Sequence, residues 1–304
     1  MSVRPASIDF TVGSRRLFAV PRQLETLSFT LEDIVSGRMP SIPLETRDAD
    51  GFRVLSAPRD GIEDLLALLG KHAIGARQDY DRHYIDMTLG HDGYLAQFSG
   101  KTRSTLRRKQ RKLAEECGGA YRFEEFRTPA EVESFIARAL PLSAMTYQAR
   151  LLDAGLPETG EAQAELLALA AEDKLRCFLL SAGTTPIAYL ALPIRAETLV
   201  YAWLGYHPDW ARLSPGTVLQ MEALERLFGE QRYRWFDFTE GDGAHKALFG
   251  TASVQCSSFI LLKPTIANRA LLSARSGFDS TIAATKTIAE KSGALAKVRG
   301  LLRA

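Results

Sequence analysis

The alternation of apolar and polar residues is most regular over 186–262, where it predicts strand, strand, loop, helix, strand, loop and strand. Two apolar runs, 186–194 and 198–205, are separated by three residues, which is the spacing of a hairpin. Apolar residues then recur at every third or fourth position over 218–228, which predicts a helix. A strand over 232–238 follows at once. We expect this block to build the central sheet of an α/β domain.

The helix over 218–228 has start and stop signals. Ser214 is a good N-cap, Pro215 fits the first turn, and Gly229 is expected to end the helix. A turn of small residues that opens a helix leaves backbone N–H groups pointing outward at the positive end of the helix dipole. Gly216 has no side chain to keep a phosphate away from these donors. The turn is therefore a candidate anion site, and an ordinary helix start is the alternative.

The remaining pattern predicts three segments. In the first 95 residues, strands are expected at 9–13, 16–20, 52–56 and 82–89, with a turn at Gly13-Ser14 and a helix at 62–69 closed by Gly70. Between 96 and 264, a strand at 121–126, a helix from 128 to 155, a helix at 162–171 and a strand at 175–181 precede the block described above. We therefore predict an N-terminal α/β half-domain (1–95) without a catalytic constellation, a catalytic domain (96–264) and a tail (265–304).

Composition limits the class of protein. Of 304 residues, 46% are hydrophobic and 24% are charged, which is ordinary for a soluble chain of one large or two modest domains. No apolar run reaches the roughly 18 residues of a membrane span, and the start of the chain lacks the apolar core of a signal peptide. Cys117, Cys177 and Cys256 are widely spaced and odd in number, which predicts reduced, buried thiols in a cytoplasmic protein.

The net charge of +2 hides two basic segments. Residues 101–112 hold seven Lys or Arg and no acid, inside a helical pattern over 93–116. A solvated helix face, nucleic-acid contact and a site for anionic partners such as phosphates or lipid headgroups are the three interpretations. No nucleic-acid-binding motif accompanies this helix, so we expect no nucleic-acid partner. Residues 265–304 predict a basic amphipathic helix, or two broken at Gly277 and Gly293, that either docks on the domain or lies on an anionic membrane surface.

Residues 237–250 read Asp-Phe-Thr-Glu-Gly-Asp-Gly-Ala-His-Lys-Ala-Leu-Phe-Gly. They resemble the Asp-Phe-x-x-Gly-Asp-x-x-Tyr-Lys-x-x-Phe/Trp-Gly signature of the GNAT acyltransferase branch related to cellulose-biosynthesis (CelD-like) acetyltransferases and, more remotely, to FemAB-type transferases. His245 replaces the usual Tyr. The family's pyrophosphate loop, Arg/Gln-x-x-Gly-x-Gly/Ala, is matched by Gly216, with Ser214 in place of the first glycine and Arg212 one position late. The resemblance covers about residues 98–262.

The resemblance implies a GNAT-like α/β (α+β) fold with a mixed, mostly antiparallel sheet flanked by helices. It also implies that acyl-CoA or acetyl-CoA is the donor and that strand edges around 189–192 and 201–204 pair with its pantetheine. The donor's phosphates are then expected at the turn formed by Arg212, Ser214, Gly216, Thr217 and Val218. Relatives carry a stretch similar to Thr-Tyr-Gln, so we expect Tyr147, Gln148 and Arg150, together with Asp242 of the signature, to bind the acceptor.

Acyl transfer to an amine needs a base, because an alkylamine is protonated at pH 7. His245 is the first candidate, since an imidazole titrates near neutral pH. Asp237 and Glu240 follow, and Lys246 is a candidate partner of Asp237 or a group that polarises an oxyanion. The alternative is a structural loop in which these carboxylates pair with Lys246. The histidines are scattered along the sequence, so we expect no metal site.

These observations predict an acyl-CoA-dependent N-acyltransferase that is cytoplasmic, with peripheral binding to the inner membrane as an option. By resemblance, its amine acceptor is an amino sugar of a polysaccharide or a long-chain base, as in GNAT-like bacterial ceramide synthases. A FemAB-like transferase that uses aminoacyl-tRNA and a non-catalytic binding module on the same fold are the alternatives.

Overall fold

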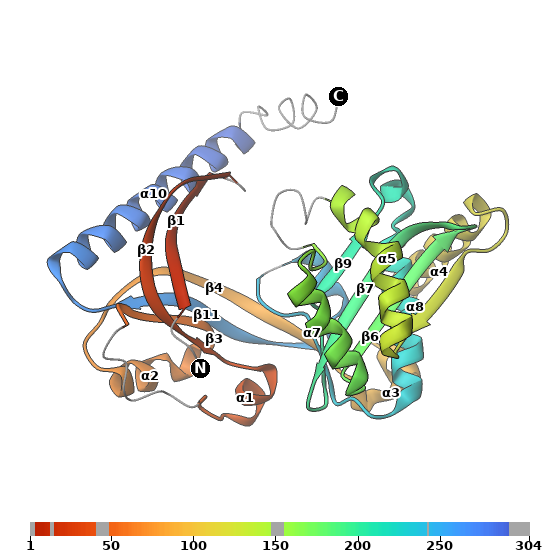
Figure 1. Cartoon of the computed structure of the whole chain (residues 1–304), viewed down its shortest axis with the longest axis horizontal. Coiled ribbons are helices and arrows are strands. Elements are labelled where there is room, and N and C mark those ends of the chain that lie inside the picture. The colour runs from red at the N-terminus through yellow and green to blue at the C-terminus, as the bar shows by residue number, and fades with distance from the viewer. Residues whose placement is uncertain (1–3, 13–14, 41–48, 147–154, 242, 292–304) are drawn as a thin grey trace. The chain divides into compact units, whose positions relative to one another are not determined.

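The computed structural model describes residues 4–12, 15–40, 49–146, 155–241 and 243–291 (Figure 1). The chain forms two compact units, residues 1–80 with 254–304 and residues 81–253. The sequence predicted three consecutive segments, with boundaries at 95/96 and 264/265. The first unit is instead discontinuous, because the strand after the second unit pairs with strands from the start of the chain.

The first unit is a sheet with helices beside it. Strands β1 (Arg4–Val12) and β2 (Arg15–Ser28) form the predicted antiparallel hairpin, whose turn lies outside the described residues. β2 pairs in parallel with β3 (Gly51–Pro58), and β3 pairs antiparallel with β11 (Ala252–Leu262). The helices are α1 (Leu31–Ser36), the 3₁₀ turn η1 (Arg59–Gly61), α2 (Ile62–Leu69), which Gly70 closes as predicted, and α10 (Ile266–Lys291).

The second unit is built on a mostly antiparallel sheet. The end of β4 (Ala73–Asp86) pairs antiparallel with β10 (Trp235–Asp237), and β10 pairs in parallel with β8 (Thr198–Val200). β8 and β9 (Trp203–Tyr206) both pair antiparallel with β7 (Thr185–Arg195), which continues to β6 (Leu175–Ala182) and β5 (Arg122–Phe126). The predicted mixed, mostly antiparallel sheet flanked by helices is confirmed.

Helices cover both faces of this sheet because β7 is apolar on both. Leu190 and Leu192 of β7 pack in one core with side chains of α3 (Gly90–Ala96), α4 (Gly100–Glu116) and α8 (Pro215–Glu230). Tyr189 and Ala191 pack in the opposite core with α5 (Pro129–Met145) and α7 (Gly160–Ala171), which lie together over the sheet in Figure 1. Short turns η2 (Met87–Leu89) and η3 (Pro208–Leu213) and helix α9 (Ala244–Phe249) complete the unit.

Several predicted boundaries are wrong. The helical pattern over 93–116 is two helices, because the Ser99 hydroxyl caps a new one. α8 continues past Gly229 and ends at Gln231, which adopts the left-handed conformation itself. The strand predicted over 232–238 is only β10, the helix predicted to reach 155 ends at Met145, and α9 was not predicted. Cys117 is half-buried, whereas Cys177 and Cys256 are buried free thiols as expected.

Helix α10 docks on the first unit. Leu272 is buried in a cluster with Ile8 and Phe10. The Phe278 ring meets the Phe10 ring edge-on at 5.5 Å between centroids, and Gly277 does not break the helix. None of the described helices is long and apolar enough to cross a membrane.

Replacing Leu272 by Ala is expected to lower the free energy of unfolding by about 2–4 kcal/mol, because it leaves a cavity where α10 packs. The control is Ile266→Ala, since Ile266 is 89% exposed at the start of the same helix. Urea unfolding followed by circular dichroism measures both variants. Equal stability of the two would contradict the docking of α10.

Candidate functional site

One strand of the second unit separates from its neighbour and leaves a backbone edge open. Ile194 of β7 lies opposite Leu199, but three residues further back Ala191 lies opposite Trp203. Residues 200–202 thus face only residues 192 and 193, so the strand bulges by one residue. The single apolar run predicted as one strand is therefore β8 followed by β9.

The bulge changes which neighbour the strand bonds. Before it, the Tyr201 N–H donates to the Asp237 carbonyl at 2.9 Å, next to the pairing of β8 with β10. After it, β9 pairs only with β7 among the described strands. The outer edge of β9 thus has no strand partner among the described residues, and such an edge presents backbone donors and acceptors in a row.

A buried polar cluster lies beside the bulge. The His245 Nε2 is 2.5 Å from the Gln220 Oε1, and the Tyr201 hydroxyl donates to the same oxygen at 3.3 Å. With the Gln220 amide in this orientation its oxygen accepts, which assigns the ring proton to Nε2 and the lone pair to Nδ1. Gln220 is fully buried, and its amide nitrogen has no partner among the described residues.

The surroundings keep His245 neutral. Its ring packs against Phe249, with 4.7 Å between centroids, and near Phe238. Burial first, and then the positive charges of Lys109 and Lys246, lower the pKa of His245 from 6.5 to about 4. A neutral imidazole is able to accept a proton at neutral pH, although a low pKa makes it a weak base.

Asp237, another predicted base, is engaged elsewhere. Arg82 donates to both carboxylate oxygens of Asp237, at 3.1 and 2.5 Å, and both side chains are buried. The Thr239 N–H also donates to Asp237, at 2.8 Å. Asp237 therefore fixes the end of β10 and is not placed as a base, and its partner is Arg82 and not Lys246. Lys246 donates to the Glu240 backbone carbonyl at 2.5 Å.

The predicted anion turn is present but offers few donors. Ser214 adopts the left-handed conformation, with φ 54°, and its side chain makes no cap hydrogen bond. Pro215 has no N–H, and the Thr217 and Val218 N–H groups both donate to the Ser214 carbonyl. Gly216 is the residue of this first turn whose N–H has no described partner.

The position of this turn is nevertheless informative. A Cβ on Gly216 would lie 3.2 Å from side-chain carbons of Leu204 and Tyr206, so the helix start packs directly on β9. Arg212 forms an ion pair with Glu116 at the end of α4 and is exposed. The start of α8 therefore lies beside β9, whereas Arg212 is held in an ion pair with Glu116.

Some predicted site residues lie outside the described residues. These are the acceptor candidates Tyr147, Gln148, Arg150 and Asp242. Sequence reasoning also missed three residues of the site, namely Arg82, Tyr201 and Gln220. Gln220 had a signal, since it is a polar residue between the apolar Leu219 and Met221 of a buried helix. No group of His, Cys, Asp or Glu within the described part of the chain is arranged to hold a metal ion.

Comparison with known proteins agrees with this geometry. Residues 100–247 match the family described as an acetyltransferase (GNAT) domain. This match supports a GNAT-type acyltransferase domain in this part of the chain. No curated protein matches the chain.

Solved structures resemble the chain at low sequence identity, and the likeness in fold is carried by FemX. FemX is 12% identical, with 86% of this chain and 88% of FemX covered and a TM-score of 0.50. L-PGS from Bacillus licheniformis is 15% identical, with 74% and 72% covered and a TM-score of 0.46. A GCN5-related N-acetyltransferase from Kribbella flavida is 11% identical, with 72% and 71% covered and a TM-score of 0.38. At these identities the likeness concerns the fold alone.

The His245 ring is expected to titrate near pH 4 in NMR spectra of the folded protein. His245→Asn identifies its resonance. Because the folded-state pKa lies below the ordinary 6.5, the stability that neutral His245 contributes is complete above pH 6.5 and is lost as the pH falls through 4. The variant should accordingly show a weaker loss of stability between pH 6.5 and 4. A titration midpoint of 6 or higher would contradict the buried, neutral imidazole.

Proposed function

We propose that the protein transfers an acyl group from the thioester of acyl-CoA to a primary amine. The observation that carries this proposal is the open edge of β9 beside the start of α8 and the His245 cluster. A thioester with a long amide-containing arm fits an edge that offers unpaired backbone groups. Its diphosphate fits the positive end of α8, where the buried Gly216 N–H has no described partner.

The amine reacts in its neutral form, and one further proton must leave it during the transfer. The amine nitrogen attacks the thioester carbon, the tetrahedral intermediate collapses, and the C–S bond breaks as the amide bond forms. The amine's proton goes to the Nδ1 lone pair of His245 and then to the departing CoA thiolate. Gln220 is the positioning residue, because its hydrogen bond to Nε2–H fixes the tautomer that leaves Nδ1 free.

We propose an acceptor from the cell envelope, either an amino sugar of a polysaccharide or a long-chain base. The support is the likeness of residues 237–250 to CelD-like transferases, in which His245 is the one departure among the signature residues. We also propose that the protein is cytoplasmic. Binding of the basic tail to an anionic membrane surface is part of this proposal, although Leu272 and Phe278 of α10 already pack on the first unit.

Aminoacyl transfer from aminoacyl-tRNA is the second candidate. It is favoured by the arginines of α4, which form no ion pair with a described acid and suit a phosphate backbone. The chemistry at His245 would be the same, since an aminoacyl ester also yields its acyl group to an amine. Acyl-CoA and aminoacyl-tRNA differ in the protein surface that binds their phosphates: the start of α8 for acyl-CoA and the arginines of α4 for aminoacyl-tRNA.

Replacing Gly216 by Glu should abolish CoA binding. The new side chain meets Leu204 and Tyr206 and places a negative charge at the phosphate site. The control is Gly229→Glu at the other end of the same helix, where an added Cβ meets nothing within 4 Å. Isothermal titration with CoA measures both, and thermal unfolding checks that both fold. CoA binding that survives in Gly216→Glu would place the donor elsewhere.

Replacing His245 by Asn should lower kcat/KM for amine acylation by about 10²–10⁴-fold, which is the usual contribution of a general base. The affinity for acetyl-CoA should stay unchanged. Release of the CoA thiol, with glucosamine and sphinganine as acceptors, measures the rate, and His72→Asn in the other unit is the control. The wild-type rate should rise with pH toward the amine's own pKa and show no step between pH 6 and 7, because His245 is already neutral there. Full activity of His245→Asn would remove this residue from the mechanism.

A further inference from the structure

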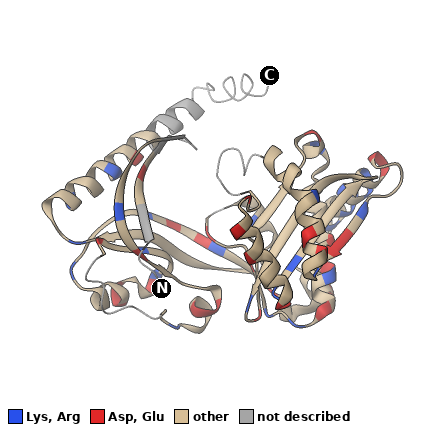
Figure 2. Cartoon of the chain, in the orientation of Figure 1, with Lys and Arg blue, Asp and Glu red and all other residues tan. Residues whose placement is uncertain are grey.

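Helix α4 carries a row of cations that no described acid neutralises. Elsewhere in the second unit, buried or half-buried arginines such as Arg82, Arg138 and Arg176 are paired with carboxylates. Arg103, Arg107 and Arg111 follow one another at intervals of four residues on α4, and none forms an ion pair with a described residue. Figure 2 shows the Lys and Arg residues of the chain in blue. Like charges at this spacing destabilise a helix. The row therefore costs stability unless an anion from outside the chain binds it.

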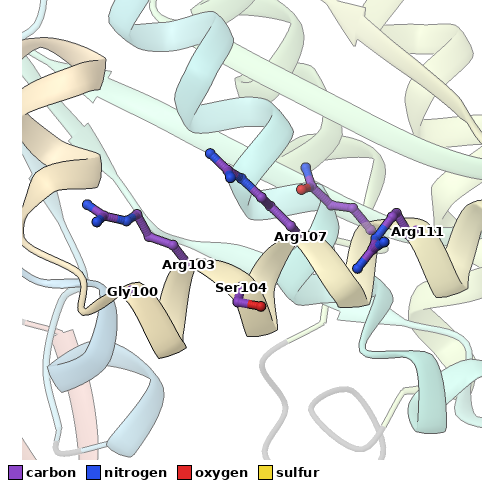
Figure 3. A pocket seen from close by; sticks show the side chains of 6 residues that line it. Gly100, Arg103, Ser104, Arg107 and Arg111 are labelled. Carbon is purple, nitrogen blue, oxygen red and sulfur yellow. The ribbon is translucent and has the colours of Figure 1, made fainter.

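These arginines line an open groove. Its walls come from one face of α4 and comprise Gly100, Arg103, Ser104, Arg107, Gln110 and Arg111 (Figure 3). Arg103 and Arg107 extend along the same side of the helix in this view. Successive arginines are separated by about 6 Å of helix rise, since each residue advances the helix by about 1.5 Å. Two neighbouring guanidinium groups are thus able to hold a single phosphate or diphosphate with several charge-assisted hydrogen bonds.

A smaller cavity continues from the groove between α3, α4 and α8. It has a volume of about 250 Å³, and Arg103 and Arg107 line it as well. Leu95, Leu106 and Met221 give it apolar walls. Arg103 and Arg107 therefore lie where the open groove meets the partly apolar cavity.

The polar groups of this cavity differ from those of the groove. Glu225 lines the cavity but not the groove. His91 also lines the cavity, and its buried Nε2 has no partner within the described part of the chain. A carboxylate beside an unsatisfied imidazole nitrogen suits a hydroxyl or amino group of a ligand, whereas it would repel a phosphate.

We propose that the groove and the cavity together bind a soluble organic phosphate ester. Its phosphates lie on Arg103, Arg107 and Arg111, and its organic part, which carries a hydroxyl or amino group, enters the cavity toward Glu225. This site is distinct from the start of α8, where the proposed donor's diphosphate binds. It does not depend on the transfer reaction, because ligand binding alone defines it.

Isothermal titration at low salt with inorganic pyrophosphate and with ADP tests the site. The wild-type protein should bind both, and ADP more tightly, because only ADP has an organic part for the cavity. The double variant Arg103→Ala/Arg107→Ala should weaken both affinities by about tenfold or more, since it removes charge-assisted hydrogen bonds to the phosphates. The matched control is Arg108→Ala/Lys112→Ala. It removes the same charge from exposed positions of the same helix outside the groove and should change the affinities less than about threefold.

Gly216→Glu separates this site from the start of α8. Pyrophosphate binding that survives in Gly216→Glu and is lost in the groove variant supports the proposal. The reverse pattern overturns it and leaves the proposed acyl transfer intact. Equal losses in the groove variant and its control, or ADP binding no more tightly than pyrophosphate, also overturn it. So does binding to phosphatidylglycerol vesicles by a protein that binds neither small phosphate, because α4 would then serve a membrane surface.

Discussion

The hydrogen bond from the Tyr201 N–H to the Asp237 carbonyl is the point on which the site depends. It lies next to the short pairing of β8 with β10, and the bulge that follows turns the chain toward β7 alone. Without the bulge, β9 would continue beside the chain after β10 and close the sheet. Because the strand instead leaves its neighbour, an edge of backbone groups is left open at the place where α8 begins.

Buried polar groups hold both sides of this opening. On one side, Arg82 and the Thr239 N–H bind the Asp237 carboxylate and so fix the end of β10. Losing one member of such a buried pair leaves an uncompensated charge and typically costs about 3–5 kcal/mol. On the other side, Gln220 joins Tyr201 to His245 and connects α8 with α9. Burial raises the pKa of the Tyr201 hydroxyl, so it remains a hydrogen-bond donor at neutral pH.

Charge is distributed unevenly over the second unit. Within the sheet and at the C-terminal end of α8, arginines pair with carboxylates, as Arg176 and Arg127 do with Glu230. These pairs stabilise the unit and leave little charge for a ligand. The arginine row of α4 has no described acid partner, and the helix start at α8 has one N–H, that of the buried Gly216, without a described partner. The two positions therefore suit different anions, a phosphate ester held by side chains and a diphosphate held by backbone and dipole.

The amino-acid sequence by itself determined the fold class, most of the strands and helices, the helix with Pro215 in its first turn and the basic helix. Each of these depends on local periodicity and on residues close together in the chain. It did not determine that Asp237 binds Arg82, that His245 lies against Gln220, or that one apolar run is divided into β8 and β9. Those features join residues that are 155 and 25 positions apart, or depend on which neighbour a strand bonds. Only the tertiary structure decided them, because pairing partners and burial, and with burial the pKa of His245, are set by packing and not by local sequence.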